Sequence, residues 1–426
     1  MTPSAIFLLQ AFVIVVVPVV LLRASGLRAL MPLVVVQIMV GIVLGPSVFG
    51  KIAPDYFQMF ASPGMLSSLS GLAFVGVLIF GLISGLHLDP GVFNGKERAF
   101  WPVAVANVAV PMTLGCFAGG WILARHPDEL LAGVSSVEFI AAIGICVSMN
   151  ALPVLGAILG EMGLLGSRVG HLALGVAGVN NIILWILLGV LLTAAAGHSG
   201  EGHALSPIYL LALAPAYLFV MIRVVRPMLA NLIMARMRDE LVNTRALVVV
   251  GAATIASALA TELMGLHYII GAFVVGAIIP AKLHEPILDR LQVMTVALLM
   301  PFFFTLTGMR ILIDPSSPVL LEMFVVTTAV AVVGIVGGTA AAARLNGEAW
   351  PVAFGLGSLL QSKGLTELIV LTILLDAQII SPRIFTAMIL MALFSAALTM
   401  PLARLALARV SQRASDEQRQ TRRARA

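Results

Sequence analysis

Charge is what this sequence has least of. Asp, Glu, Lys and Arg together make up 11% of its 426 residues, against roughly 25% in an ordinary soluble domain. Hydrophobic residues make up 60%, and the mean hydropathy is +1.07. A chain this apolar was not built to face water, which predicts an all-α polytopic membrane protein. The formal net charge of +5 then reflects orientation in the lipid bilayer, and no nucleic-acid partner is expected.

Cysteine is nearly absent, and so are the motifs of common enzymes. Cys116 and Cys146 each lie in an apolar run without the spacing of metal ligands. This favours two small core residues over a disulfide or a metal site. The sequence has no HExxH, no GxSxG, no paired carboxylates and no Cys/His cluster. It therefore predicts no enzymatic activity, no cofactor and no metal.

Apolar segments long enough to cross a bilayer fill the chain. A transmembrane helix needs roughly 17 to 25 such residues, and the segments separated by charged or Pro/Gly-rich connections predict about thirteen transmembrane helices. The first run follows an uncharged N-terminus without a cleavage site, so we interpret it as a span and not as a signal peptide. The predicted spans are 4–22, 29–46, 65–86, 100–123, 136–158, 169–195, 206–225, 246–263, 267–281, 292–312, 319–343, 350–375 and 384–408.

Lysine and arginine orient this array. They concentrate in alternate connections and beyond span 384–408, leaving only Lys51, Arg125 and Arg383 on the opposite side. Cytoplasmic connections carry the excess of basic residues, so an outside N-terminus and a cytoplasmic C-terminus are predicted in a multi-pass protein of the cell inner (plasma) membrane. We expect residues 1–410 to form one transmembrane domain and residues 411–426 a short, basic, disordered tail near anionic lipid.

Two predicted spans in one stretch are interrupted by polar residues. In span 136–158, Ser148 and Asn150 precede Pro153, which has no N–H and breaks a helix. In the next span, Asn180 and Asn181 stand side by side among aliphatic residues. Lipid cannot hydrogen-bond such groups, so they must face protein or a water-filled cavity. That cavity is the best candidate for a functional site.

A second interruption lies near the other end of the chain, where Lys363, Gly364 and Glu367 share one predicted span. One broken span in each half indicates inverted repeats with a binding site near the membrane midplane. Lys363 and Glu367 are four residues apart and are also compatible with an internal ion pair. Arg310, near the end of its span, is either an interfacial arginine or an internal positive charge beside the site.

Motifs along almost the whole chain resemble those of one known family. They lie at residues 41–47 (GIVLGPS), 150–155 (NALPVL), 261–273 (TELMGLHYIIGAF), 301–310 (PFFFTLTGMR), 363–371 (KGLTELIVL), 391–394 (MALF) and 401–402 (PL). In order and spacing they resemble the monovalent cation:proton antiporters, in particular the branch with bacterial sodium or potassium/proton antiporters and plant cation/proton exchangers.

This resemblance implies an antiporter fold in which two broken helices cross. It also implies a homodimer with a dimerisation bundle and a transport bundle that works by alternating access. The broken positions would include Pro153 and Gly364. Small inorganic ions and protons would be the transported species.

One departure from the family limits what the resemblance implies. At the positions of Asn180 and Asn181 the antiporters carry Asp-Asp, Asn-Asp or Gln-Asp, and the second aspartate exchanges a cation for protons. An amide neither gives nor takes a proton in the physiological range. The ion-binding and transport residues expected here are Ser148, Asn150, Asn180, Asn181, Arg310, Lys363 and Glu367.

Three hypotheses remain open from the sequence. The first is an antiporter whose proton site has moved, to Glu367 or Glu138. The second is a transporter of a small anion such as a halide, because amide N–H₂ donors and positive charges would remain after the carboxylate is lost. The third is a family member without transport activity that serves as a membrane enzyme, sensor or assembly protein.

Overall fold

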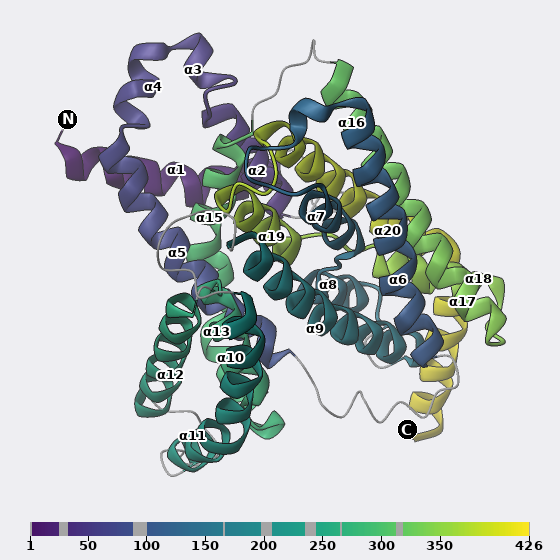
Figure 1. Ribbon diagram of the computed structural model, residues 1–426. Helices are drawn as coiled ribbons and strands as arrows, with labels where there is room; N and C mark the ends of the chain where they lie inside the picture. The colour runs from purple at the N-terminus through teal and green to yellow at the C-terminus, as the bar shows by residue number, and fades with distance from the viewer. Residues whose placement is uncertain are drawn as a thin grey trace. The chain divides into compact units, whose positions relative to one another are not determined.

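The protein is described by a computed structural model over residues 2–24, 33–87, 100–164, 167–196, 207–234, 244–264, 266–311 and 318–425. Every regular element in these ranges is a helix (Figure 1). The chain divides into two compact units, and each is built from two separate segments. Unit 1 comprises Met1–Pro90 and Leu188–Asp314, and unit 2 comprises Gly91–Leu187 and Pro315–Ala426.

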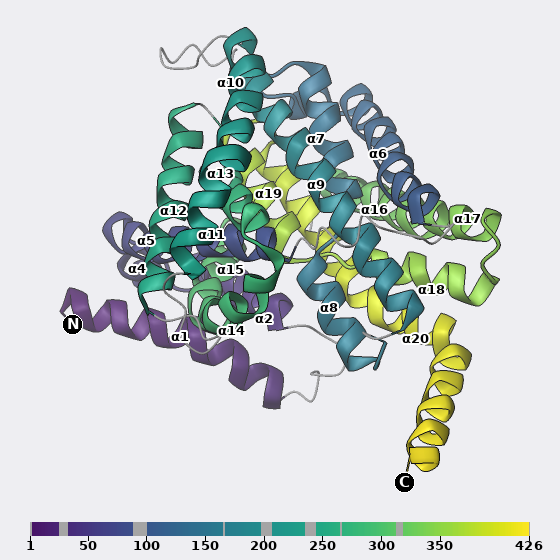
Figure 2. The same ribbon diagram turned by 90° about the horizontal axis from the view of Figure 1, so that it is seen from below.

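Unit 1 packs its helices through glycines. A Cβ added to Gly41 of α2 or to Gly308 of α15 would collide with the backbone of the other helix, and the same holds for Gly85 of α5 and Gly276 of α13. Small residues allow such close approach where lipid gives no hydrophobic drive. Helices α12 and α13 lie side by side in both views (Figures 1 and 2).

The helices of unit 1 are α1 (Pro3–Ala24), α2 (Leu33–Leu44), α3 (Phe49–Ile52), α4 (Pro54–Phe60), α5 (Pro63–Leu86), α10 (Pro207–Val220), η4 (Met221–Val225), α11 (Arg226–Met234), α12 (Thr244–Leu263), α13 (Tyr268–Ile278), η5 (Ala281–Leu283), α14 (His284–Met294), η6 (Thr295–Leu299) and α15 (Met300–Met309).

Unit 2 repeats one pattern in its two segments: a long helix, a broken helix and a second long helix. This is the pairing of interruptions that the sequence predicted. The first segment contains α6 (Phe100–Arg125), η3 (Pro127–Glu129), α7 (Ser136–Ser148), α8 (Leu152–Glu161) and most of α9 (Arg168–Ala196). The second contains α16 (Pro318–Val332), η7 (Val333–Gly337), α17 (Gly338–Leu345), α18 (Trp350–Leu360), α19 (Leu365–Asp376) and α20 (Pro382–Arg425).

Within the described residues, ten helices are long and apolar enough to cross a membrane. The other three predicted spans, 136–158, 267–281 and 350–375, begin in the shorter apolar helices α7, α13 and α18. A multi-pass α-helical membrane protein is therefore confirmed, and the count of thirteen stays a prediction. The connections 88–99 and 235–243, which carry several of the basic residues used for orientation, lie outside the described residues.

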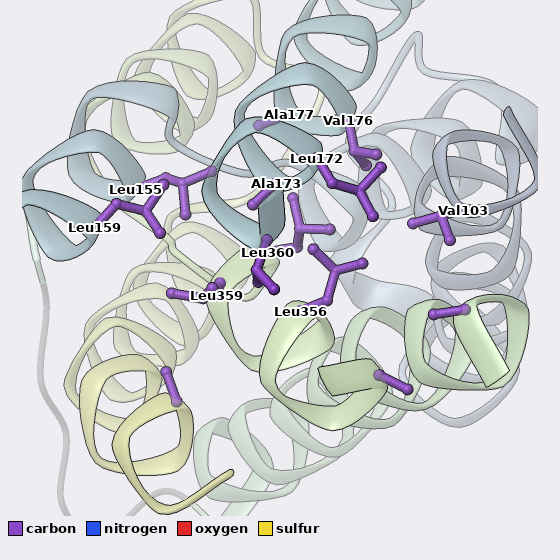
Figure 3. Packing of buried hydrophobic residues seen from close by; sticks show 14 of the residues in the cluster. Val103, Leu155, Leu159, Leu172, Ala173, Val176, Ala177, Leu356, Leu359 and Leu360 are labelled. Carbon is purple, nitrogen blue, oxygen red and sulfur yellow. The ribbon is translucent and has the colours of Figure 1, made fainter. Parts of the chain in front are cut away.

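An apolar cluster forms the core of unit 2 around the broken helices (Figure 3). Leu155 and Leu159 of α8 pack with Ala173 of α9 and with Leu356 and Leu360 of α18, all fully or almost fully buried. Because protein interiors pack as tightly as organic crystals, this cluster fixes α8, α9 and α18 as one body. The polar residues at the breaks are thus held on a rigid frame.

Two local predictions were wrong. The expected disordered tail is helical, because α20 continues without interruption to Arg425; its Arg, Gln, Glu and Ala residues are good helix formers. The helix that contains span 292–312 begins earlier than expected. It is continuous from Ala281 to Met309 and includes the π-helical turn η6. Polar residues at its start made that segment resemble a connection.

Candidate functional site

The first break lies between α7 and α8. Helix α7 ends at Ser148, and Met149 and Ala151 adopt extended backbone conformations before α8 begins at Leu152. Pro153 stands in the first turn of α8, where its missing N–H is no loss. The proline therefore starts the second half-helix, and the chain opens on its N-terminal side.

The second break contains no proline. Residues 361–364 separate α18 from α19, and Gly364 is the residue before α19 begins. A Cβ at Gly364 would lie 2.7 Å from Cγ2 of Val154 in α8. Glycine is needed here because the two breaks approach each other so closely.

The backbones of the two breaks are hydrogen-bonded to each other. The Ala151 N–H donates to the Ser362 carbonyl at 2.7 Å. The Ser362 hydroxyl lies 3.5 Å from the Ala151 carbonyl, at the limit of a hydrogen bond. Backbone groups freed by breaking a helix must find partners inside protein at membrane depth. Two broken helices that meet at their breaks, as the family resemblance implies, are thus present within unit 2.

The Lys363 side chain caps the C-terminal end of α7. Its ammonium donates to the carbonyls of Cys146 and Val147, each at 2.9 Å. A cation at a helix C-terminus is stabilised by the carbonyl dipoles there. The same ammonium lies 3.3 Å from Oε1 of Glu367, and both side chains are fully buried. The ion pair predicted from their spacing is therefore present, and Glu367 stands in the first turn of α19.

The two adjacent asparagines have different surroundings. Asn180 is fully buried, and its Nδ2 donates to Oδ1 of Asn107 at 2.9 Å and to the Ser148 carbonyl at 3.1 Å. Asn181 bonds back to its own helix, donating to the Ala177 carbonyl at 3.1 Å. Only Asn180 is thus tied to the end of α7.

Unit 2 contains all the predicted site residues except one. Arg310 belongs to unit 1, where it ends α15 with an exposed side chain. Glu138, the second candidate for a displaced proton site, is engaged in a capping box with Ser135 at the start of α7. Arg310 remains a prediction as a site residue.

Three buried polar residues of this region escaped the sequence analysis. Asn107 of α6 accepts from Asn180 and from Nδ2 of Asn150 and donates to Thr339 of α17. Gln361 is fully buried at the second break. Asn107 has a sequence signal, since it lies four residues before Pro111 within an apolar run. Thr339 has none, because a threonine in an apolar helix normally bonds to its own backbone.

Several buried side-chain atoms near the breaks are left without a hydrogen bond. Within the part of the chain that the structure describes, they include Oδ1 of Asn150, Oδ1 of Asn180 and Oε2 of Glu367, while Oε1 of Glu367 lies 3.3 Å from the Lys363 ammonium. Nε2 and Oε1 of the buried Gln361 amide also have no hydrogen-bond partner. Such buried acceptors are rare in native proteins, and they point to a water or an ion. Among His, Cys, Asp and Glu of the described residues, no group of three could hold a metal ion.

Polar residues at two broken helices that meet are the arrangement found in secondary transporters of the membrane. The chain belongs to the sodium/hydrogen exchanger family, whose transmembrane model matches residues 11–404. The family is one of cation/proton antiporters and not of enzymes.

Relatives of this family extend over most of the chain. Cation/H(+) antiporter 19 of Arabidopsis thaliana is 29% identical over 381 residues, which are 88% of this chain and 46% of that protein. K(+)/H(+) antiporter 1 of Saccharomyces cerevisiae is 27% identical, with 95% and 46% covered. The chain thus spans about half the length of several relatives. Na(+)/H(+) antiporter NhaS4 of Synechocystis is 27% identical and is covered over 98% of its length.

A solved structure supports the fold. The sodium proton antiporter MjNhaP1 from Methanocaldococcus jannaschii, determined at pH 8, superimposes with a TM-score of 0.63 and covers 95% of this chain and 99% of its own. The sequence identity is 13%, so this likeness bears on the fold alone. The antiporter fold expected from the sequence motifs is thereby confirmed.

Proposed function

We propose that this chain exchanges a monovalent cation for protons by alternating access, with the ion bound at the crossing of α7–α8 and α18–α19. One observation carries the proposal: the atoms that Asn150 and Asn180 leave unpaired are both oxygens, and Glu367 adds a buried carboxylate in the same unit. Oxygen atoms are the ligands of alkali cations and the acceptors of protons. Relatives named for sodium and for potassium make these two ions the substrates to test.

The same observation weighs against transport of a small anion. That hypothesis required amide N–H₂ donors directed at the ligand, with Arg310 beside them. Instead, Nδ2 of Asn150, Asn180 and Asn181 each donates to protein acceptors. A halide would meet oxygen atoms, which repel it. Membership in a family of transporters likewise disfavours the non-transporting enzyme, sensor or assembly role.

Glu367 is the proton carrier in this proposal. It is buried, ionisable and paired with Lys363, whereas the family's usual aspartate is absent. When Glu367 is ionised, the pair is neutral and a cation can occupy the amide oxygens. When Glu367 takes a proton, the charge of Lys363 is exposed and opposes the cation. Two unit charges 4 Å apart interact by about 4 kcal/mol at an effective dielectric constant of 20, which is enough to exchange proton for cation without a shared ligand.

Unit 2 contains the whole of this site, and we assign it the role of the transport bundle. Unit 1 would be the scaffold and would hold the dimer contact of a homodimer. The protein would lie in the plasma membrane with an outside N-terminus and a cytoplasmic C-terminus. Residues 1–410 would form the transmembrane domain, followed by the short basic tail.

Proteoliposomes test this function. Sodium or potassium gradients should drive proton movement in vesicles that contain the unmodified protein, and Glu367→Gln should abolish the coupling. Glu161→Gln is the matched control, since Glu161 is a half-exposed carboxylate paired with Arg404 away from the breaks. Proton movement that responds to chloride or fluoride and ignores both cations would refute the proposal. Coupling that survives in Glu367→Gln would refute the carrier alone.

A further inference from the structure

A proline in α6 frees a backbone carbonyl beside the candidate site. In a continuous helix the N–H of residue 111 would donate to the carbonyl of Asn107. Pro111 has no N–H, so this carbonyl keeps no partner from its own helix. Nδ2 of Asn180 lies 3.4 Å from it. Asn107 therefore presents two oxygens, one from its backbone and one from its side chain, to the same amide.

The side chain of Asn107 joins three other elements of unit 2. Its Oδ1 accepts from Nδ2 of Asn180 in α9 at 2.9 Å and from Nδ2 of Asn150 in the first break at 3.2 Å. Its own Nδ2 donates to Oγ1 of Thr339 in α17 at 3.0 Å. Asn107 and Thr339 are fully buried. Every polar atom of the Asn107 side chain is thus used within protein.

This network determines which way each amide points. Asparagine oxygen and nitrogen are distinguished by their partners, and the Ser148 carbonyl, 3.1 Å from Asn180, can only accept. Asn180 must therefore turn its nitrogen there and toward Asn107, which in turn must offer its oxygen. Asn150, facing that same oxygen, must also present nitrogen. The oxygens of Asn150 and Asn180 are consequently the atoms left unpaired.

Close helix packing holds Asn107 in place. A Cβ on Gly334 of η7 would lie 2.7 Å from Cα of Pro111, and a Cβ on Gly338 would lie 2.8 Å from Cβ of Val110. The π-helical turn η7 directly precedes Gly338 and Thr339. Such turns re-aim the residues that follow them and are frequent at functional sites. Here the turn and the glycines bring Thr339 within reach of Asn107.

We propose that Asn107 is the positioning residue that determines cation specificity in this protein. It holds the amides of Asn150 and Asn180 so that both present oxygen, and not nitrogen, to the transported ion. Thr339 keeps the Asn107 side chain in that orientation, and the proline-freed carbonyl of Asn107 accepts a second bond from the Asn180 amide. The inference rests on the proposed cation exchange, and it assigns to α6 a role that no motif of the sequence indicated.

Cation binding and exchange by four variants test this role. Asn107→Ala removes the shared acceptor and lets both amides rotate. We expect an increase in cation Kd and KM of about tenfold, equivalent to roughly 1.4 kcal/mol, together with a loss of the preference between sodium and potassium. Turnover at saturating cation should change less than the KM. Asn107→Asp keeps the acceptor and should retain the cation preference, since Thr339 can donate to it.

Two milder variants test the same role in case Asn107→Ala does not fold. Thr339→Val removes only the hydroxyl, and Pro111→Ala restores the N–H that competes for the Asn107 carbonyl. Each should raise the cation KM by about two- to threefold, because one weak hydrogen bond is worth roughly 0.5 kcal/mol. Val105→Ala, on an exposed face of the same helix, is the control and should leave KM unchanged.

Binding is measured without transport, as the shift of thermal unfolding that sodium or potassium causes in the purified protein. If the unmodified protein binds a cation but does not exchange it, the proposed function fails while the Asn107 comparison still decides the inference. A folded Asn107→Ala protein with unchanged affinity and preference would overturn the inference, as would an unmodified protein that binds neither cation.

Discussion

Lys363 and Asn180 divide between them the three carbonyls that end α7. The Lys363 ammonium takes those of Cys146 and Val147, and the Asn180 amide takes that of Ser148. One partner is a charge from the second segment of unit 2, and the other is a neutral amide from the first. The broken end of α7 is therefore satisfied by protein groups, and the stability of the crossing depends on both side chains.

Removing the Lys363 charge should destabilise the protein strongly. In Lys363→Met, the Val147 carbonyl loses its donor, the Cys146 carbonyl keeps only the Met149 N–H at 3.4 Å, and Glu367 keeps a buried charge without a counter-ion. Breaking one side of a buried pair costs roughly 3–5 kcal/mol, so the thermal unfolding midpoint should fall well below that of the unmodified protein.

The second partner supplies the control for this variant. The double variant Lys363→Met/Glu367→Gln removes both charges and should recover part of the loss, while Lys363→Arg keeps the charge. A double variant no more stable than Lys363→Met would show that the two side chains are not coupled.

The two adjacent asparagines should respond differently to the same substitution. Asn181→Asp restores a carboxylate where the antiporters carry one, and among the described residues Asn181 bonds to Ala177 of its own helix. Proton and cation should then compete directly for that carboxylate, so the cation KM should rise as the pH is lowered. The measurement is cation-driven proton flux at several pH values.

Asn180→Asp should instead impair folding. Its carboxylate would face the Ser148 carbonyl and the free carbonyl of Asn107 without an N–H to donate. Burying such an unpaired charge destabilises by at least about 3 kcal/mol, which a lower yield of monodisperse protein and a lower unfolding midpoint would reveal. Equal stability of the two aspartate variants would contradict the separate roles assigned to Asn180 and Asn181.

Gly144 should not tolerate a methyl group. It lies where α7 packs on α6, and a Cβ there would stand 2.6 Å from Sγ of Cys116 and 3.1 Å from the Met112 carbonyl. Overpacking of this kind costs about 1–3 kcal/mol, so Gly144→Ala should lower the unfolding midpoint. Cys116→Ala in the same chain removes the nearer obstacle and should restore part of the lost stability. Gly120→Ala is the control, since its Cβ would meet Cδ1 of Ile140 at an ordinary contact distance of 3.9 Å.

Glu129 and Arg383 form an ion pair at the start of α20, and replacing one should destabilise the protein more than replacing the other. Glu129 is 2% exposed and pairs with Arg383, which is about half exposed, and Ser381 donates to the same carboxylate. Arg383→Ala leaves the buried Glu129 carboxylate without Arg383 as its counter-ion, and it should destabilise the folded protein by about 3 kcal/mol. Glu129→Gln leaves Arg383 half exposed and still 3.3 Å from Asp128, and it should cost about 1 kcal/mol. Unfolding midpoints of the two variants in the same detergent give the comparison, and the reverse order would refute it.

Much of the fold follows from the sequence because lipid imposes simple rules on it. Apolar length and the proline at position 153 predicted the spans and the first break, and the resemblance at residues 150–155 and 363–371 predicted that the breaks meet. Which backbone groups pair was not predictable, since the bond from Ala151 to Ser362 joins residues far apart in the chain. The start of span 292–312 was placed too late because the polar residues of α14 made the beginning of that helix resemble a connection.

The site was predicted in part for a similar reason. Ser148, Asn150, Asn180, Lys363 and Glu367 stood out as polar groups in apolar runs, and the structure brings them into one unit. Asn107 was equally polar and equally placed, but a single asparagine carries little signal without its partners. Its importance comes from Pro111, Thr339, Gly334 and Gly338, which act only once the helices are packed.

The mutual pairing of the two breaks has a consequence for leakage. Because Ala151 and Ser362 satisfy each other's backbone groups, the crossing remains intact after an ion departs. An unloaded carrier would then meet no backbone penalty on its way back, and such a return would dissipate the gradient without exchange. In the proposed exchange the unloaded crossing keeps Glu367 ionised beside Lys363 as a neutral pair, so the charge of this pair would not oppose the return either, and some movement without exchange is expected.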